Sequence, residues 1–343
     1  MLTARWIVMA LVVGGGGGAC HGRAAPAPAR HLASTADDRG PTSAPAPVAG
    51  RPPAAVAAAA DASAAGPAAV GARQRTALHE AAYAGDLAAI DRLVAAGADL
   101  EAVETVYQAT PLLLALEFAK HDAARRLLDA GASVAGTVGP RALALAARSS
   151  DAVLVAALRG RGATVAGSFA LHAAARWGDR ASVEAVLTAG AVVDEVEPDD
   201  GWTPLMIAAM SGNAGAVDAL LAAGATVGLR DGHRRTALHW AVFAERPTEV
   251  HRYPRGGGPH DTYWIPRTAA PITAALIGHH AALDAVDDDG NTALHDAAMF
   301  DARAAAALLL AAGARTTLRN RAGATPAQLA RARNNSVAPL LAP

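Results

Sequence analysis

Histidines beside acidic residues are the side chains of this 343-residue sequence that come nearest to a catalytic pattern. His79 is followed directly by Glu80, which matches the first half of the helical H-E-x-x-H zinc site. That site needs a second histidine one helical turn later, and Tyr83 stands in its place. The pair therefore lacks the second imidazole ligand that this zinc site requires.

A second group of possible metal ligands lies in and near one short segment around residue 250. The ligand types suit zinc, but their spacing matches no metal-binding motif. We keep a metal-binding or enzymatic site here as the alternative to the main hypothesis, which has no catalytic residue, metal site or cofactor. The residues concerned are His233, His251, His260, Asp261, His279 and His280.

Four other histidines, His79, His172, His239 and His295, recur at one position of a repeated pattern. A position fixed by a repeat favours a structural hydrogen-bonding role over a catalytic one. The clearest copies read T-A-L-H-x-A, and others are partly degraded. The copies begin at Thr76, Thr110, Arg141, Phe169, Thr203, Thr236, Thr292 and Thr325.

A second recurring series confirms this register. A residue that can end a helix follows each apolar run at the same offset, and paired aliphatic residues precede it. The series is Gly97, Gly131, Gly162, Gly190, Gly224, His280 and Gly313.

The pattern resembles the ankyrin repeat, whose period is about 33 residues and whose signature is T-P-L-H-x-A. The resemblance covers residues 73–343 and implies an all-α solenoid of about eight helix-loop-helix repeats with hairpin fingers. Threonine would cap the first helix of each repeat, and glycine would end the second. The repeat that begins at Arg141 lacks the threonine, proline and histidine, so we expect easier local opening there.

One repeat is longer than the others, because Thr236 and Thr292 are separated by about 23 more residues than the period allows. The insertion, at about 246–268, contains Tyr253, Tyr263 and Trp264. Long insertions in compact domains are often functional, and exposed aromatic residues are typical interface anchors. Both a partner-contacting loop and a merely tolerated loop remain open here.

The resemblance implies a protein-protein interaction module, a scaffold, adaptor or inhibitor, that binds through the concave face of its inner helices and its finger tips. Large side chains gather at the variable inner-helix positions, although packing against a neighbouring repeat is an equal alternative for several of them. We expect a monomer that binds a protein partner. The predicted partner-binding residues are Tyr83, Trp177, Met210, Trp240, Phe243, Met299 and Phe300, with Tyr253, Tyr263 and Trp264 of the insertion.

The N-terminus reads as an export signal over residues 1–19, with Arg5 before a short apolar run and a stretch of small residues. Cys20, the single cysteine, follows directly. The run Gly17-Gly18-Ala19-Cys20 resembles the lipobox of bacterial lipoproteins, although Gly17 stands where leucine is usual. The resemblance implies lipidation at Cys20 and a cell-envelope location facing the periplasm or exterior; the alternative is a secreted or soluble periplasmic protein.

Residues 20–72 would then be a tether, because alanine, proline, glycine and serine dominate them and little apolar surface is available for burial. The formal net charge of -1 and the single lysine, Lys120, argue against a nucleic-acid partner or a polybasic membrane patch. The membrane would therefore be reached only through the lipid on Cys20.

Overall fold

The structure is a computed structural model that describes residues 75–245, 248–252, 261–265 and 269–342. All of these residues belong to one compact unit, Ala62–Pro343. The predicted signal segment, the lipidation site at Cys20 and the tether to residue 72 lie outside the described residues.

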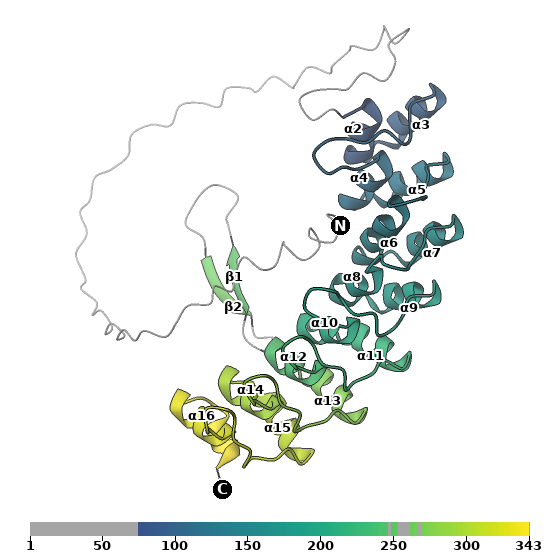
Figure 1. Cartoon of the computed structure of the whole chain (residues 1–343). Helices are drawn as coiled ribbons and strands as arrows, with labels where there is room; N and C mark the ends of the chain where they lie inside the picture. Colours follow the sequence, from purple (N-terminus) through teal and green to yellow (C-terminus); the bar gives the residue numbers. More distant parts are fainter. Residues whose placement is uncertain (1–74, 246–247, 253–260, 266–268, 343) are drawn as a thin grey trace, which may run out of the picture. The chain divides into compact units, whose positions relative to one another are not determined.

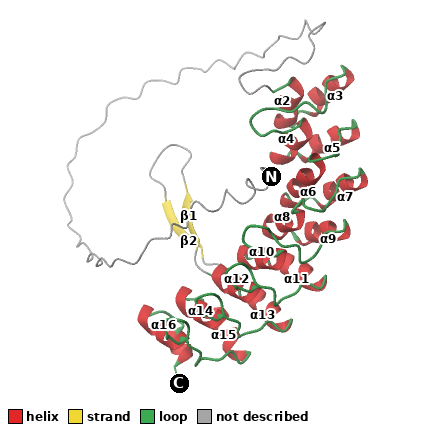
Figure 2. Cartoon of the chain, in the orientation of Figure 1, coloured by secondary structure: helices red, strands yellow, loops and turns green. Residues whose placement is uncertain are grey.

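The helices form two rows that alternate along the sequence (Figures 1 and 2). The inner row is α2 (Ala77–Ala84), α4 (Pro111–Glu117), α6 (Val138–Arg148), α8 (Ala170–Trp177), α10 (Pro204–Ser211), α12 (Ala237–Ala244), α14 (Ala293–Phe300) and α16 (Pro326–Arg333). The outer row is α3 (Leu87–Ala95), α5 (His121–Asp129), α7 (Ala152–Gly160), α9 (Arg180–Thr188), α11 (Ala214–Ala222), α13 (Ala270–Gly278) and α15 (Arg303–Ala311). A 3-10 turn, η1 (Ala338–Leu341), packs against α16.

Each inner helix packs against the next inner helix, from α2 on α4 to α14 on α16, and the outer helices follow the same order. The predicted all-α solenoid is confirmed. Small residues allow the inner helices to approach closely, as at Ala82, Ala146 and Ala208, which are completely buried. Outer helices contribute larger groups such as Leu127 and Leu220, also completely buried. Burying one such leucine stabilises a fold by about 1.5–3 kcal/mol.

The recurring threonines begin the inner helices as the sequence predicts. Thr76 and Thr203 have extended backbones, and their hydroxyl groups accept hydrogen bonds from the amides of His79 and Met206. Proline at the first helical position, as in Pro204, removes an amide that would have no partner there. The glycine series ends the outer helices with left-handed backbones, and His280, which replaces a glycine, does the same with φ 62°.

A buried histidine bridges neighbouring repeats at four places. In the first repeat, Nδ1 of His79 accepts the Thr76 amide at 3.2 Å, and Nε2 lies 3.1 Å from the carbonyl oxygen of Ala109 in the next finger. We assign the ring proton to Nε2, because only a protonated nitrogen can donate to a carbonyl. The same contact to the following finger is made by His172, His239 and His295.

These histidines are neutral at physiological pH. Burial lowers the pKa of His172 to about 4, although backbone hydrogen bonds to Trp202 and Glu195 raise it in part. Burial also lowers the pKa values of His79, His239 and His295. The predicted structural role of the recurring histidine is therefore explained by a neutral ring that joins a helix start to the next repeat.

The third repeat is built differently, since α6 begins at Val138 and takes up residues that other repeats use for a finger. Thr137 and Phe169, which precede α6 and α8, make no capping hydrogen bond through their side chains. Phe169 also has φ 50°, a conformation that is costly for a residue with a side chain. At Gly139 an added Cβ would lie 2.4 Å from the Val134 carbonyl oxygen, so only glycine fits there.

The insertion lies between α12 and α13 and contains an antiparallel pair of strands. Strand β1 (Thr248–Arg252) pairs with β2 (Asp261–Ile265), with Thr248 opposite Ile265 and Arg252 opposite Asp261. This strand pairing was not predicted from the sequence.

We predict that the third repeat opens more easily than the sixth. It lacks both the threonine cap and the histidine bridge, and each such hydrogen bond contributes about 1 kcal/mol. Native-state hydrogen exchange should therefore give α6 an opening free energy about 1–2 kcal/mol below that of α12. Equal protection of the two helices would contradict this prediction.

Candidate protein-binding surface

The first group of aromatic residues on the inner side lies between α2 and α4. The rings of Tyr83 and Tyr107 both meet Phe118 edge-on, with centroids 4.6 and 5.8 Å away. The guanidinium of Arg75 lies 5.2 Å from the Tyr83 centroid and 5.9 Å from that of Tyr107. Both tyrosines stay 40% exposed, so this cluster presents two aromatic rings in a fixed arrangement.

Trp177, at the end of α8, is also 40% exposed. Its ring lies 5.0 Å from the guanidinium carbon of Arg176. Stacking of an arginine on an indole restricts both side chains, which lowers the entropy that binding would cost. The structure therefore leaves this predicted contact residue exposed and held against an arginine.

Trp240 on α12 is buried rather than prominent, with 6% of its surface exposed. Its ring packs against Trp202, in the finger before α10, at a centroid distance of 4.8 Å. Its indole nitrogen donates a hydrogen bond to Asp231, in the finger before α12, at 2.9 Å. Arg235 stacks on it at 5.2 Å. Trp240 therefore holds the neighbouring fingers in place and has little exposed surface for contact with a partner.

The aromatic row continues from Trp240 across two repeats. Phe243 lies 5.5 Å from the Trp240 ring and 5.4 Å from Phe300 on α14, both edge-on. Phe243, Phe300, Met299 and Met210 are all half-buried. Tyr253 lies outside the described residues, and the structure describes only the backbone of Tyr263 and Trp264, in β2.

Some finger residues that look like surface charges in the sequence are structural. Asp231 is 6% exposed and accepts the amides of His233 and Arg235, which closes the finger turn. Asp287 is 3% exposed and closes the next finger by accepting the amides of Asp289 and Asn291. These two carboxylates hold the fingers in shape and are not free to contact a partner.

A cavity of about 50 Å³ opens beside the aromatic row, between α12 and α14. Its apolar lining comes from Trp240, Phe243, Met299 and Phe300, and its polar lining from Arg235, His239, Asp289, Asn291 and Asp296. Trp240 and Asp296 occupy the same variable position of the motif in successive repeats. The stacking of the repeats is therefore what brings an indole and a carboxylate to one cavity.

Asp296 is the unusual group in this lining. It is 6% exposed. Burial, together with the charges of Asp287 and Asp289, raises its pKa to about 7 although Arg235 lowers it in part. Glu80 has the same motif position in the first repeat, but it is exposed and pairs with Arg75 at 3.5 Å.

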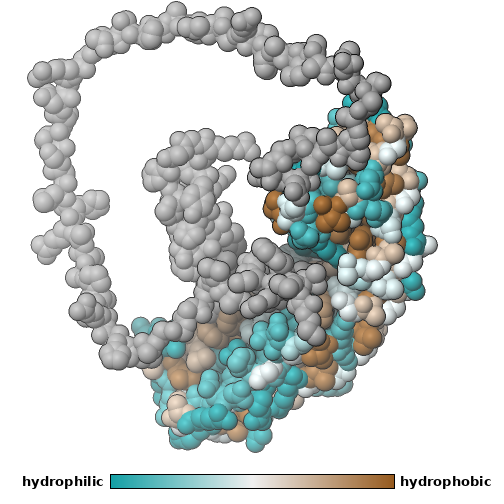
Figure 3. All heavy atoms as spheres, turned by 45° about the horizontal axis from the view of Figure 1, so that its top comes forward, coloured by the Kyte–Doolittle hydropathy of each residue, from teal (hydrophilic) through white to brown (hydrophobic). Residues whose placement is uncertain are grey.

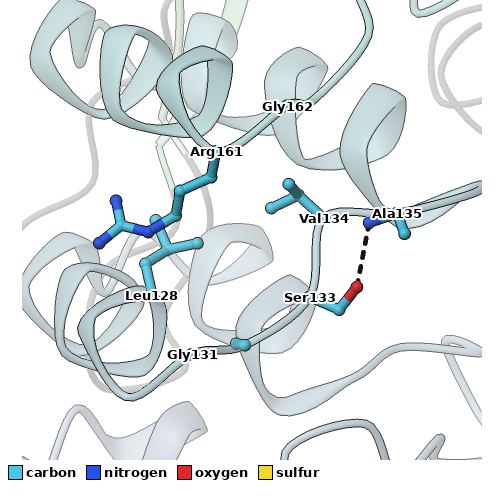
Figure 4. A pocket seen from close by; sticks show the side chains of 8 residues that line it. Leu128, Gly131, Ser133, Val134, Ala135, Arg161 and Gly162 are labelled. Carbon is cyan, nitrogen blue, oxygen red and sulfur yellow. Dashed lines mark hydrogen bonds between the residues drawn. The ribbon is translucent and has the colours of Figure 1, made fainter.

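A larger hollow of about 490 Å³ lies on another part of the array, between the ends of α5 and α7 (Figure 4). Its charged lining residue, Arg161, is paired with Asp129 at 2.8 Å. The rest of the lining is glycine, small aliphatic groups and Ser133, which accepts the amide of Ala135. We therefore assign no function to this hollow.

The face of the molecule in Figure 3 carries several separate hydrophobic patches between hydrophilic ones. Across the described part of the chain, no group of three or more histidine, cysteine, aspartate or glutamate residues is placed to hold a metal ion. Among the same residues, no helix is both long and apolar enough to cross a membrane.

Sequence reasoning missed three residues of the aromatic groups: Tyr107, Phe118 and Trp202. Tyr107 and Trp202 lie in fingers, shortly before the capping threonine of the next inner helix. An aromatic residue just before that threonine was the available signal, because the finger end lies against the inner row.

A model described as ankyrin repeats in three copies matches residues 171–253, and the single ankyrin repeat matches residues 73–104 and 289–321. Comparison with curated proteins finds no match.

The stacked helix pairs and their bridged fingers define a helical-repeat solenoid. The matching family models identify ankyrin repeats within it, and the described array is an ankyrin-repeat solenoid. Ankyrin repeats generally mediate protein-protein interaction, and neither match indicates a catalytic family.

We predict that Asp296→Asn stabilises the protein at pH 8. The pKa of Asp296 in the folded protein is raised above its usual value of 3.8. Below pH 3.8 this carboxyl group is protonated in the folded and unfolded states and does not change the free energy of unfolding. As the pH rises from 3.8 toward 7, the group ionises only in the unfolded state, so the free energy of unfolding falls. The substitution removes the buried charge and should raise the free energy of unfolding by about 1–3 kcal/mol at pH 8.

Urea unfolding at pH 8 and pH 4 would measure this difference, which should be much smaller at the lower pH. Asp218→Asn, on the exposed side of α11, is the matched control and should change stability at neither pH. A loss of stability in Asp296→Asn at pH 8 would show that the carboxylate is favourably paired and would refute the prediction.

Proposed function

We propose that the protein is a non-catalytic interaction module that grips a protein partner with the inner-helix face of its ankyrin array. The observation that carries the proposal is the set of aromatic groups on the inner helices α2, α8, α12 and α14. Tyr83 and Trp177 are each 40% exposed and each lie against an arginine. Rigid aromatic side chains supported by neighbouring groups are what protein interfaces use as anchors.

The fingers support the same function. Glu195 and Glu197 lie in the finger before α10, and burial raises the pKa of both carboxyl groups. Asp199 and Asp200 raise the pKa of Glu197 further, and Arg176 lowers it. The next finger carries Arg230, His233, Arg234 and Arg235. Charges of both signs at the edge of an apolar row select a partner by electrostatic complementarity.

Site-specific photo-crosslinking tests this surface in the cells that make the protein. We predict that p-benzoylphenylalanine at Trp177, on the inner row, captures a protein partner. The same probe at Val153 is the matched control, because Val153 is 69% exposed but lies on the outer helix α7. Crosslinks of equal yield from both positions, or from Val153 alone, would place the interface elsewhere.

We also propose that the chain is exported and held in the cell envelope by a lipid on Cys20, with the array facing the periplasm or exterior. The support is the sequence alone: Arg5, the apolar run and the small residues that end at the single cysteine. Anchoring would keep the partner-binding face close to the membrane, since membrane affinity grows with each buried methylene of an acyl chain.

Cell fractionation of a Cys20→Ser variant tests the anchor. We predict that the parent protein sediments with membranes and that the variant moves largely into the soluble fraction, because the substitution removes the acylated thiol. Ala19→Ser, one residue earlier, is a control for changes to the segment that keep the thiol. Unchanged membrane association of Cys20→Ser would rule out the lipid and leave the secreted or soluble periplasmic alternative.

A further inference from the structure

The cavity between α12 and α14 holds a carboxylate whose burial the fold does not explain. Asp296 is 6% exposed, and no residue that the structure describes donates a hydrogen bond to its side chain. A buried carboxylate without a partner is costly, because the charged form loses its hydration. A ligand that donates hydrogen bonds and carries positive charge would stabilise such a group.

Three other polar residues of the cavity, Arg235, His239 and Asn291, already have partners. His239 lies 3.2 Å from the Asn291 carbonyl oxygen through its Nε2 atom, and the Asn291 side chain accepts from Asn320. Arg235 stacks on Trp240 and lies 3.7 Å from Asp287. These groups cannot turn toward Asp296 without breaking contacts that fix the finger and the repeat junction.

The charge around the cavity is negative. Among the described residues that act on the Asp296 carboxylate, Asp287 and Asp289 are acidic and Arg235 is basic, and Arg235 already pairs with Asp287. The nearby Asp231 is used by the Trp240 indole and by finger amides. A cationic guest therefore meets an excess of carboxylates, whereas an anionic guest would be repelled.

We propose that this cavity binds the guanidinium group of an arginine side chain presented by the protein partner, with Asp296 as the counter-ion. The inference rests on the proposed function, since it names the chemistry that one part of the inner-helix face recognises. A guanidinium is planar, weakly hydrated and able to stack on aromatic rings while it pairs with a carboxylate. Arg235, whose guanidinium stacks on the Trp240 ring, is an example of this interaction in the lining of the same cavity.

The size of the cavity agrees with a single side-chain end. At about 50 Å³ it has several times the space that one water molecule needs, and it is too small for a drug-sized ligand. The apolar wall of Trp240 and Met299 suits the aliphatic stem, and Asp296 lies where the charged end would be held. The cavity therefore fits a residue of a polypeptide better than a free cofactor.

Fluorine NMR of the full chain labelled with 5-fluorotryptophan tests the proposal. The probe is Nα-acetylarginine amide, and the comparison is Nα-acetylcitrulline amide, which has nearly the same shape without the charge. The Trp240 resonance, assigned from Trp240→Phe, should shift and saturate with the arginine probe at a Kd on the order of 1–10 mM. Citrulline should bind about ten-fold more weakly or not at all, and the Trp177 resonance reports non-specific effects.

Asp296→Asn should weaken arginine binding by about ten-fold or more, whereas Asp218→Asn should leave it unchanged. Equal binding of arginine and citrulline, or full binding by Asp296→Asn, would overturn the proposal. A further variant carries glutamine at the insertion arginines 246, 252, 255 and 267. Arginine binding by this variant alone would show that the insertion is the occupant, which would also overturn the proposal.

The two proposals can fail separately. Crosslinking at Trp177 without any arginine-specific shift would keep the interaction module and discard the guanidinium site. An arginine-specific shift lost in Asp296→Asn, without position-dependent crosslinking, would keep the cavity as an arginine site and discard the wider surface.

Discussion

The structure depends on one constraint: each repeat has apolar faces that only its neighbours can cover. An isolated pair such as α10 and α11 would leave Leu205, Ile207 and Leu220 open to water, and in the array all three are buried. Stability is therefore shared between adjacent repeats rather than held within each one. The bridging histidines act at the same junctions, because each ties the start of one inner helix to the finger of the next repeat.

This constraint also explains why so much of the fold could be predicted. Stacking requires the same residue types at the same positions of each repeat, so the T-A-L-H-x-A motif recurs many times along the chain. A threonine that begins a helix and a residue that ends one with a left-handed backbone are local requirements, visible without coordinates. Even His280, which replaces the expected glycine, takes the left-handed conformation with φ 62°. In the third repeat the missing signature residues correspond to a helix, α6, that begins early at Val138.

The site was harder to predict, because exposure depends on contacts between repeats that no single repeat encodes. Trp177 and Trp240 both lie on inner helices, yet one is 40% exposed and the other 6%. Trp177 is the last residue of α8, whereas Trp240 lies in the first half of α12 and packs against Trp202 of the finger before α10. Nor could the sequence show that Asp231 and Asp287 close finger turns, since that role depends on amides brought to them by the folded loop.

Asp296 shows how a repeat protein can specialise one surface position without disturbing the stack. The variable position of the motif carries different residues in different repeats, Glu80 in the first, Trp240 in the sixth and Asp296 in the seventh, while the helices keep their order in the stack. In this array the preceding repeat carries Trp240 at that position, and Asp287 and Asp289 come from the finger before α14. Burial then makes the carboxylate costly to the free protein and sensitive to a cation. A position that opposes folding in this way is where a partner can gain the most by binding.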